Sequence, residues 1–191
     1  MRLFAGIPIA GNVLDNLARV FKQLRPLGPL RWSAVENFHI TTKFIGEWPE
    51  AKLEMLESAL EEVKVPGPFD ITIAGFGYFP NPHHPRTLFA AVRGGPHLAE
   101  LAANTDKALH ALGIASEDRP YSPHLTLAKI KHEDLRDLRE HLANMTNTDF
   151  GTFPATEFQL YLSQTGPKGS VYSSLAVFPL AAASSQAGPP Q

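Results

Sequence analysis

Two histidine–threonine pairs in this chain could together do acid–base chemistry on a phosphate. His39 and Thr41 lie in the apolar run 38–46, and His124 and Thr126 follow in a similar run, 85 positions after the first pair. Both runs are rich in β-branched and apolar residues, which favour strands. Residues two apart on a strand share a face, so each strand is predicted to present one imidazole and one hydroxyl together.

Two imidazoles that face one another suit the opening of a phosphodiester. One can take a proton from water while the other protonates the departing oxygen, because an unperturbed imidazole titrates at about pH 6.5. The hydroxyls of Thr41 and Thr126 could donate hydrogen bonds to the phosphate oxygens on which charge develops. A His-x-Thr triplet is also common by chance, and the same residues could serve structure alone on half-buried strands.

A lysine follows each pair. Lys43 is four positions after His39 and is therefore expected on the same face as a phosphate ligand, although it could also be a solvated lysine at the rim of a sheet. Lys129 is five positions after His124, so a regular strand would turn it away from that histidine. Only a bulge or a strand end would redirect Lys129 toward a bound phosphate.

Three aromatic residues, Trp32, Tyr121 and Phe4, could stack on a nucleobase or could belong to the core or its rim. The adjacent His83 and His84 lie in a proline-rich loop without the helical spacing of a zinc motif. No metal and no other cofactor is therefore predicted.

Hydrophobic periodicity predicts an α+β chain, in which strands and helices alternate in two comparable halves that each hold one pair. We interpret this as two β-sheet lobes that face each other. Strands are predicted at residues 2–7, 30–33, 38–46, 69–76, 86–93, 124–130, 157–163 and 171–178, with a turn at 164–170. Helices are predicted at 13–24, 49–63, 98–112 and 133–145, with a break at 66–68. The polar, Pro- and Gly-rich tail 181–191 is expected to be disordered.

Composition narrows the class of protein. The 191 residues include no cysteine, which excludes disulfides and thiolate chemistry. No run approaches the roughly 20 apolar residues of a membrane span, and no signal peptide is evident, so a cytoplasmic protein without membrane contact is expected. The net charge of −2 argues against binding long nucleic acid through its backbone, unless basic residues cluster on one face. An RNA end or a small nucleotide is the expected partner, and a monomer without an obligate protein partner is expected.

The two motifs resemble those of the two-histidine (2H) phosphoesterase superfamily. The resemblance rests on Arg31-Trp32 and on the runs 37–47 and 119–129, and it includes residues 1–7, Leu160-Tyr161, Tyr172 and 178–180. Within the superfamily the chain is most similar to the bacterial and archaeal RNA 2′,3′-cyclic phosphodiesterases, also called 2′-5′ RNA ligase-like proteins. The match covers about residues 1–180 and implies one bilobal domain over that range, with a pseudo-twofold arrangement and a cleft between the lobes.

The resemblance also implies roles for particular residues. His39 and His124 would be catalytic, Thr41 and Thr126 would hold the phosphate, and Lys129 stands where many relatives carry an arginine. The implied reaction is metal-independent hydrolysis of RNA 2′,3′-cyclic phosphate ends to 2′-phosphates, with His124 as the base and His39 as the acid. The alternatives are another small cyclic or 2′-5′ linked nucleotide as substrate, reversible 2′-5′ RNA ligation, and a nucleotide- or RNA-binding module without turnover.

Overall fold

The chain folds into two antiparallel sheets with helices outside them. The computed structural model describes residues 1–65, 67–131, 133–167 and 169–180. The first sheet has the strand order β3-β1-β8-β9 and the second has the order β2-β6-β5-β4-β7. The strands are β1 (Arg2–Pro8), β2 (Arg31–Trp32), β3 (His39–Glu47), β4 (Phe69–Phe79), β5 (Thr87–Arg93), β6 (His124–Lys129), β7 (Asp149–Ala155), β8 (Glu157–Gly166) and β9 (Gly169–Pro179). The helices are α1 (Gly11–Leu24), α2 (Leu53–Glu61), α3 (Gly95–His110) and α4 (Arg136–Asn144).

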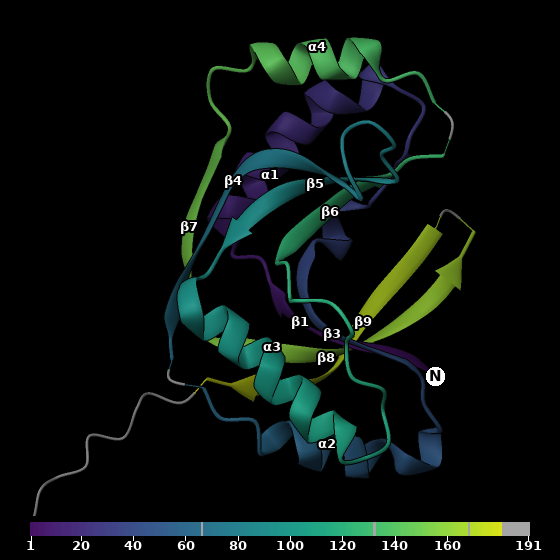
Figure 1. Ribbon diagram of the computed structural model, residues 1–191, viewed down its shortest axis with the longest axis vertical. Helices are drawn as coiled ribbons and strands as arrows, with labels where there is room; N and C mark the ends of the chain where they lie inside the picture. Colours follow the sequence, from purple (N-terminus) through teal and green to yellow (C-terminus); the bar gives the residue numbers. More distant parts are fainter. Residues whose placement is uncertain (66, 132, 168, 181–191) are drawn as a thin grey trace, which may run out of the picture.

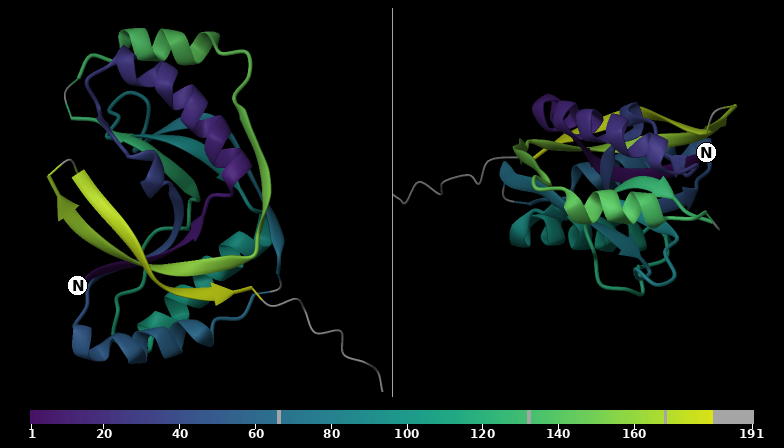
Figure 2. Two further views of the ribbon diagram at one scale, coloured as in Figure 1. Left: turned by 180° about the vertical axis from the view of Figure 1, so that it is seen from behind. Right: turned by 90° about the horizontal axis from the view of Figure 1, so that it is seen from above.

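Each sheet turns one face toward helices and the other toward the opposite lobe. Helices α2 and α3 pack together, and α3 packs on β3 of the first sheet. Helix α1 packs on β7 of the second sheet, and α4 lies in the same lobe (Figure 1). The two sheets diverge from a junction at which β3 and β6 are in contact (Figure 2). The prediction of an α+β fold with two facing sheets and outer helices is confirmed.

The chain crosses repeatedly between the lobes. Strand β1 belongs to the first sheet, α1 to the second lobe, and β3 to the first sheet again. The same path is repeated with the lobes exchanged, since β5 belongs to the second sheet, α3 packs on the first, and β6 returns to the second. The bounds of β5 lie 85 positions after those of β1, as His124 does after His39. Each lobe is therefore built from both halves of the chain.

The helices form where apolar residues recur every three or four positions. Helix α1 buries Val13, Leu17, Phe21 and Leu24 against the second sheet. Helix α3 is followed by Gly113, whose positive φ of 85° is the left-handed conformation that glycine adopts after a helix. The helices therefore cover the outer faces of the sheets, and the inner faces are left for the candidate site.

Strand β7 was not predicted, because Gly151 and Pro154 interrupt its sequence. It is an edge strand of the second sheet, where a proline without an N–H group is tolerated. The predicted turn 164–170 is shorter than expected, because β8 and β9 extend into it, and α4 begins at Arg136 rather than at 133. The predictions for Pro66 and for the tail 181–191 lie outside the described residues.

Candidate active site

The first histidine lies at the start of β3 and is held in one tautomer. Its Nδ1–H donates to the carbonyl of Asn37 over 2.7 Å, and its Nε2 lies 2.9 Å from the hydroxyl of Thr41. Because a carbonyl can only accept, Nδ1 carries the proton of the neutral ring and Nε2 is the atom that can gain or lose one. Aromatic rings surround the imidazole, with centroids 4.5, 5.2 and 5.9 Å away for Phe4, Tyr172 and Tyr161.

The second histidine repeats this arrangement in the other sheet. The Nδ1–H of His124 donates to the carbonyl of Ser122 over 2.8 Å, again two residues earlier in the chain. Its ring lies edge-on to Phe79 and Phe89, at centroid distances of 4.8 and 5.6 Å. Phe89 lies 85 positions after Phe4, so an equivalent phenylalanine on the neighbouring strand supports each histidine. The two lobes thus hold two imidazoles with Nε2 as the reactive atom.

Burial and neighbouring charges lower the pKa of both histidines. For His39, loss of solvent lowers the pKa, the bond to Asn37 opposes this, and the charge of His124 lowers it further. For His124, burial again has the largest effect, the bond to Ser122 opposes it, and the charge of Lys129 adds to the lowering. These causes couple His39 with His124 across the lobes, and His124 with Lys129 within β6. The lowered pKa favours the neutral form of both rings, and an anion that comes near them would raise the pKa.

Equivalent bulges interrupt the two motif strands. In β3, Thr41 pairs with Gly6 and Lys43 pairs with Ala5, so Thr42 is an extra residue. In β6, Leu127 is the extra residue, 85 positions later. An extra residue reverses the alternation of side chains beyond it. The bulge in β6 therefore turns Lys129 onto the face of His124, where its Nζ donates to the hydroxyl of Thr87 over 3.1 Å.

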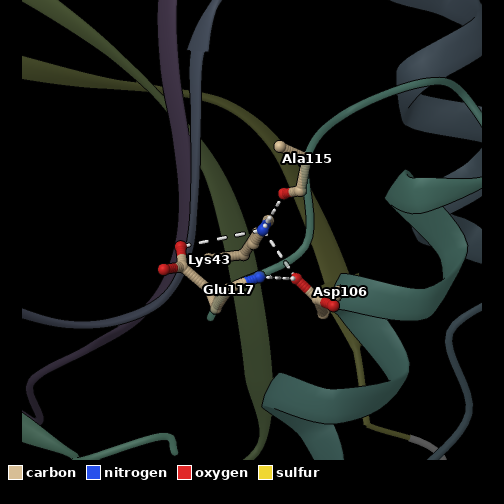
Figure 3. A network of polar contacts seen from close by, with 4 residues as sticks. All are labelled: Lys43, Asp106, Ala115 and Glu117. Atoms are coloured by element: carbon tan, nitrogen blue, oxygen red, sulfur yellow. Dashed lines mark hydrogen bonds and ion pairs between the residues drawn. The ribbon is translucent and has the colours of Figure 1, made fainter. Parts of the chain in front are cut away.

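The matching bulge in β3 turns Lys43 away from His39. The Lys43 side chain is 1% exposed, and its Nζ lies 2.6 Å from Asp106 of α3, 2.7 Å from the carbonyl of Ala115 and 3.7 Å from Glu117 (Figure 3). The expectation that Lys43 shares the face of His39 and binds phosphate is wrong, because simple alternation ignores the bulge. Phe44 takes that side instead and is 62% exposed.

The three aromatic residues proposed for base stacking have structural partners. Phe4 is only 3% exposed, and its ring stacks on that of Tyr161 with centroids 5.0 Å apart. The ring of Phe4 also packs against the ring of His39. The indole of Trp32 donates to the carbonyl of Gly28 over 3.1 Å and packs edge-on against Phe21. Phe4 and Trp32 are thus packing residues, which favours a core or rim position over base stacking for both.

Tyr121 connects the two lobes. Its hydroxyl donates to the backbone carbonyl of Thr41 over 2.9 Å, and burial raises its pKa. Tyr121 precedes His124 by three residues, so this bond joins the approach to the second histidine to the strand that carries the first. We therefore interpret Tyr121 as a residue that positions the two strands, and not as a free stacking surface.

The aromatic partners of His124, Phe79 and Phe89, were missed from the sequence. A signal for Phe89 was present, since the triplet Leu3-Phe4-Ala5 recurs as Leu88-Phe89-Ala90 at the same 85-residue offset as the histidines. Gly77 makes room for this ring, because a Cβ at that position would lie 2.3 Å from Phe89.

Within the described residues, no group of three or more His, Cys, Asp and Glu side chains is placed to hold a metal ion. The backbone N–H groups of His83 and His84 both donate to the side chain of Asn81, in an exposed loop. No helix in these same ranges is long and apolar enough to cross a membrane.

Comparison with known proteins decides the family. The family model described as "LigT like Phosphoesterase" matches residues 7–89 and 92–172, and the second stretch begins 85 positions after the first. The chain belongs to the LigT-like phosphoesterase family. This confirms the resemblance to the 2H phosphoesterases inferred from the two motifs.

Similar LigT-like phosphoesterases are known from archaea and bacteria. A protein of Archaeoglobus fulgidus named RNA 2′,3′-cyclic phosphodiesterase is 32% identical over 178 residues, which cover 93% of this chain and 99% of that protein. A protein of Thermus thermophilus with the same name is 33% identical over 187 residues, covering 94% of this chain and 90% of its own.

Solved structures agree with the fold. The crystal structure of the Thermus thermophilus protein TT0787 has a TM-score of 0.78 and 30% identity, and the match covers 94% of this chain and 98% of that one. The structure of E. coli LigT complexed with 3′-AMP has a TM-score of 0.75, with 94% of this chain and 97% of that chain covered. At 24% identity, the second likeness concerns the fold alone.

Proposed function

We propose that the chain hydrolyses RNA 2′,3′-cyclic phosphate ends to 2′-phosphates without a metal ion, with His39 and His124 as acid and base. The observation that carries this proposal is the matched pair of imidazoles, each held by an Nδ1–H bond to the carbonyl two residues earlier. A module that only binds nucleotides has no need of two imidazoles held in the same tautomer. The names of relatives at about 30% identity support the substrate class.

The two histidines have distinct roles in this proposal. Burial, together with the charge of Lys129, lowers the pKa of His124, which favours the neutral form that a base requires. His124 takes a proton from water as the water oxygen forms a bond to phosphorus. The bond from phosphorus to the 3′ oxygen breaks, and His39 gives that oxygen a proton, leaving a 2′-phosphate and a 3′-hydroxyl. The anionic phosphate raises the pKa of His39 when it binds, which favours the charged form of this acid.

Charge on the phosphate is balanced by fixed donors. The hydroxyls of Thr41 and Thr126 donate to the oxygens that do not leave, where charge builds in the transition state. Thr41 stands 2.9 Å from Nε2 of His39, so a phosphate oxygen bound by its hydroxyl lies next to the proposed acid. Lys129 supplies the neutralising positive charge on the other side.

Substrates with good leaving groups test these roles. His39→Ala and His124→Ala should each lower kcat by roughly 10²–10⁴-fold. Because the pair acts as a unit, the double variant should lose far less than the product of the two losses. A substrate whose leaving group departs unprotonated should restore the rate of His39→Ala only. Restoration of His124→Ala alone would reverse the roles, and restoration of neither would contradict the mechanism.

A further inference from the structure

We propose that Arg31, next to Lys129, forms a second phosphate subsite, which binds the internucleotide phosphate on the 5′ side of the cyclic end. This inference rests on the proposed function and specifies its substrate as the 3′ end of an RNA chain, in preference to a mononucleotide. It depends on the direction of two side chains, on their register, and on the charges around them.

The packing of Trp32 fixes the direction of Arg31. Strand β2 consists of these two residues alone. Trp32 packs on Phe21 of α1, with ring centroids 5.0 Å apart, so it points to the helix-covered face of the second sheet. Successive residues of a strand point to opposite faces, and exposed Arg31 therefore points toward the other lobe.

Strand register places Arg31 beside the proposed catalytic groups. Arg31 lies directly opposite Lys129, Lys129 opposite Thr87, and Thr87 opposite Phe79. Residues directly opposite share a face, with Cα atoms about 4.5–5.5 Å apart in antiparallel sheets. These four side chains thus form one row across β2, β6, β5 and β4. Phe79 touches the ring of His124 at 4.8 Å, so the row lies next to the cyclic-phosphate position.

The two cations of this row lack an anionic partner. Within the described ranges, neither Arg31 nor Lys129 forms an ion pair with a carboxylate. Like charges placed directly opposite one another destabilise a sheet, and the chain as a whole carries a net charge of −2. Two unpaired cations beside the proposed phosphodiesterase site are therefore best explained by two phosphates, the cyclic phosphate near Lys129 and a second phosphate near Arg31.

The first sheet offers no equivalent site within the part of the chain that the structure describes. Phe44 occupies the position that corresponds to Lys129, and Lys43 is bound to Asp106 on the helix side. Arg2, which corresponds to Thr87, lies directly opposite Glu47, so its charge has an acidic neighbour. The two halves of the pseudo-twofold site therefore differ in their unpaired positive charge, and we expect the RNA backbone to run over the second sheet.

Substrates that differ by one phosphate test the subsite. We would compare a nucleoside 2′,3′-cyclic phosphate with a dinucleotide that has the same cyclic end and one internucleotide phosphate. In Arg31→Gln, the ratio of kcat/KM for the dinucleotide to that for the mononucleotide should fall about tenfold, since one charge-assisted hydrogen bond is lost. Arg19→Gln makes the same charge change on the exposed side of α1 and should leave the ratio unchanged. An unchanged ratio in Arg31→Gln would overturn the subsite while leaving the proposed function intact.

Binding provides a readout that does not depend on turnover. A ten-nucleotide RNA ending in a 2′-phosphate should bind Arg31→Gln about tenfold more weakly than wild type, whereas a nucleoside 2′-phosphate should show a smaller change. The slope of log Kd against log salt for the long RNA should decrease by about 0.7 in this variant. Absence of turnover in wild type, together with this binding difference, would refute the proposed reaction alone. Equal losses for both ligands would refute the subsite.

Discussion

The buried ammonium of Lys43 makes the fold dependent on one carboxylate. Lys43 is 1% exposed, and Asp106 holds its Nζ at 2.6 Å, while Glu117 lies 3.7 Å away with its side chain 57% exposed. Asp106→Asn keeps the size of the side chain and removes its charge. The ammonium is then left with the carbonyl of Ala115 and one distant, solvated carboxylate.

The expected loss follows from this geometry. Removing one partner of a buried ion pair costs about 3–5 kcal/mol, because the remaining charge is uncompensated. Asp106 is 25% exposed and Glu117 remains, so we expect the lower end, about 3 kcal/mol. Glu117→Gln removes a longer and largely solvated pair and should cost at most about 1 kcal/mol. Adding Lys43→Met to Asp106→Asn should recover part of the loss, since no unpaired charge stays buried.

Urea unfolding at pH 7 measures these differences as changes in the midpoint at constant m-value. A pH series adds a second check. Burial raises the pKa of Asp106, but hydrogen bonds from Lys43, Ser116 and the N–H of Glu117 lower it more, so the net shift is downward. The resulting stability is present above the unfolded value of 3.8 and is lost as the pH falls through the folded value. Asp106→Asn should flatten this acid limb. Equal losses in Asp106→Asn and Glu117→Gln would refute the reasoning.

Three further predictions concern activity. Lys129→Gln should move the limb of the pH profile of kcat/KM that belongs to His124 toward higher pH, and an unmoved limb would mean that the charge is too distant. Lys129→Arg keeps the charge and should keep substrate binding. Excess EDTA should leave turnover unchanged, and a loss reversed by one divalent ion would contradict the metal-independent mechanism. Tyr121→Phe removes the bond to the Thr41 carbonyl and should lower kcat about tenfold with little change in KM, which a matching rise in KM would disprove.

The sequence was sufficient to predict the directions of the candidate-site side chains that precede the bulges. His39 and Thr41 obey simple alternation, as do His124 and Thr126, so their shared faces could be predicted. Beyond Thr42 and Leu127 the alternation reverses, and nothing in either residue type signals this. Prediction therefore failed for Lys43 and left the direction of Lys129 open. The catalytic and phosphate-binding roles themselves stay predictions.

The arrangement of the lobes depends on contacts that local sequence patterns do not contain. The alternation of strands and helices was predictable, but the exchange of α1 and α3 between the lobes depends on pairing over long chain separations. Strand β7 was missed because Gly151 and Pro154 resemble loop residues, and only its edge position makes them acceptable.

The duplicated path bears on the different tasks that we propose for the two equivalent histidines. The 85-residue offset repeats each histidine, its threonine, its supporting phenylalanine and its bulge, which places equivalent imidazoles on opposing sheets. In-line displacement at phosphorus needs groups on opposite sides, but it also needs one neutral and one charged partner. One of the positions at which the repeat departs from equality is Phe44, which corresponds to Lys129. Burial and the charge of Lys129 lower the pKa of His124, and in the proposed reaction the cation near this ring would favour His124 as the base.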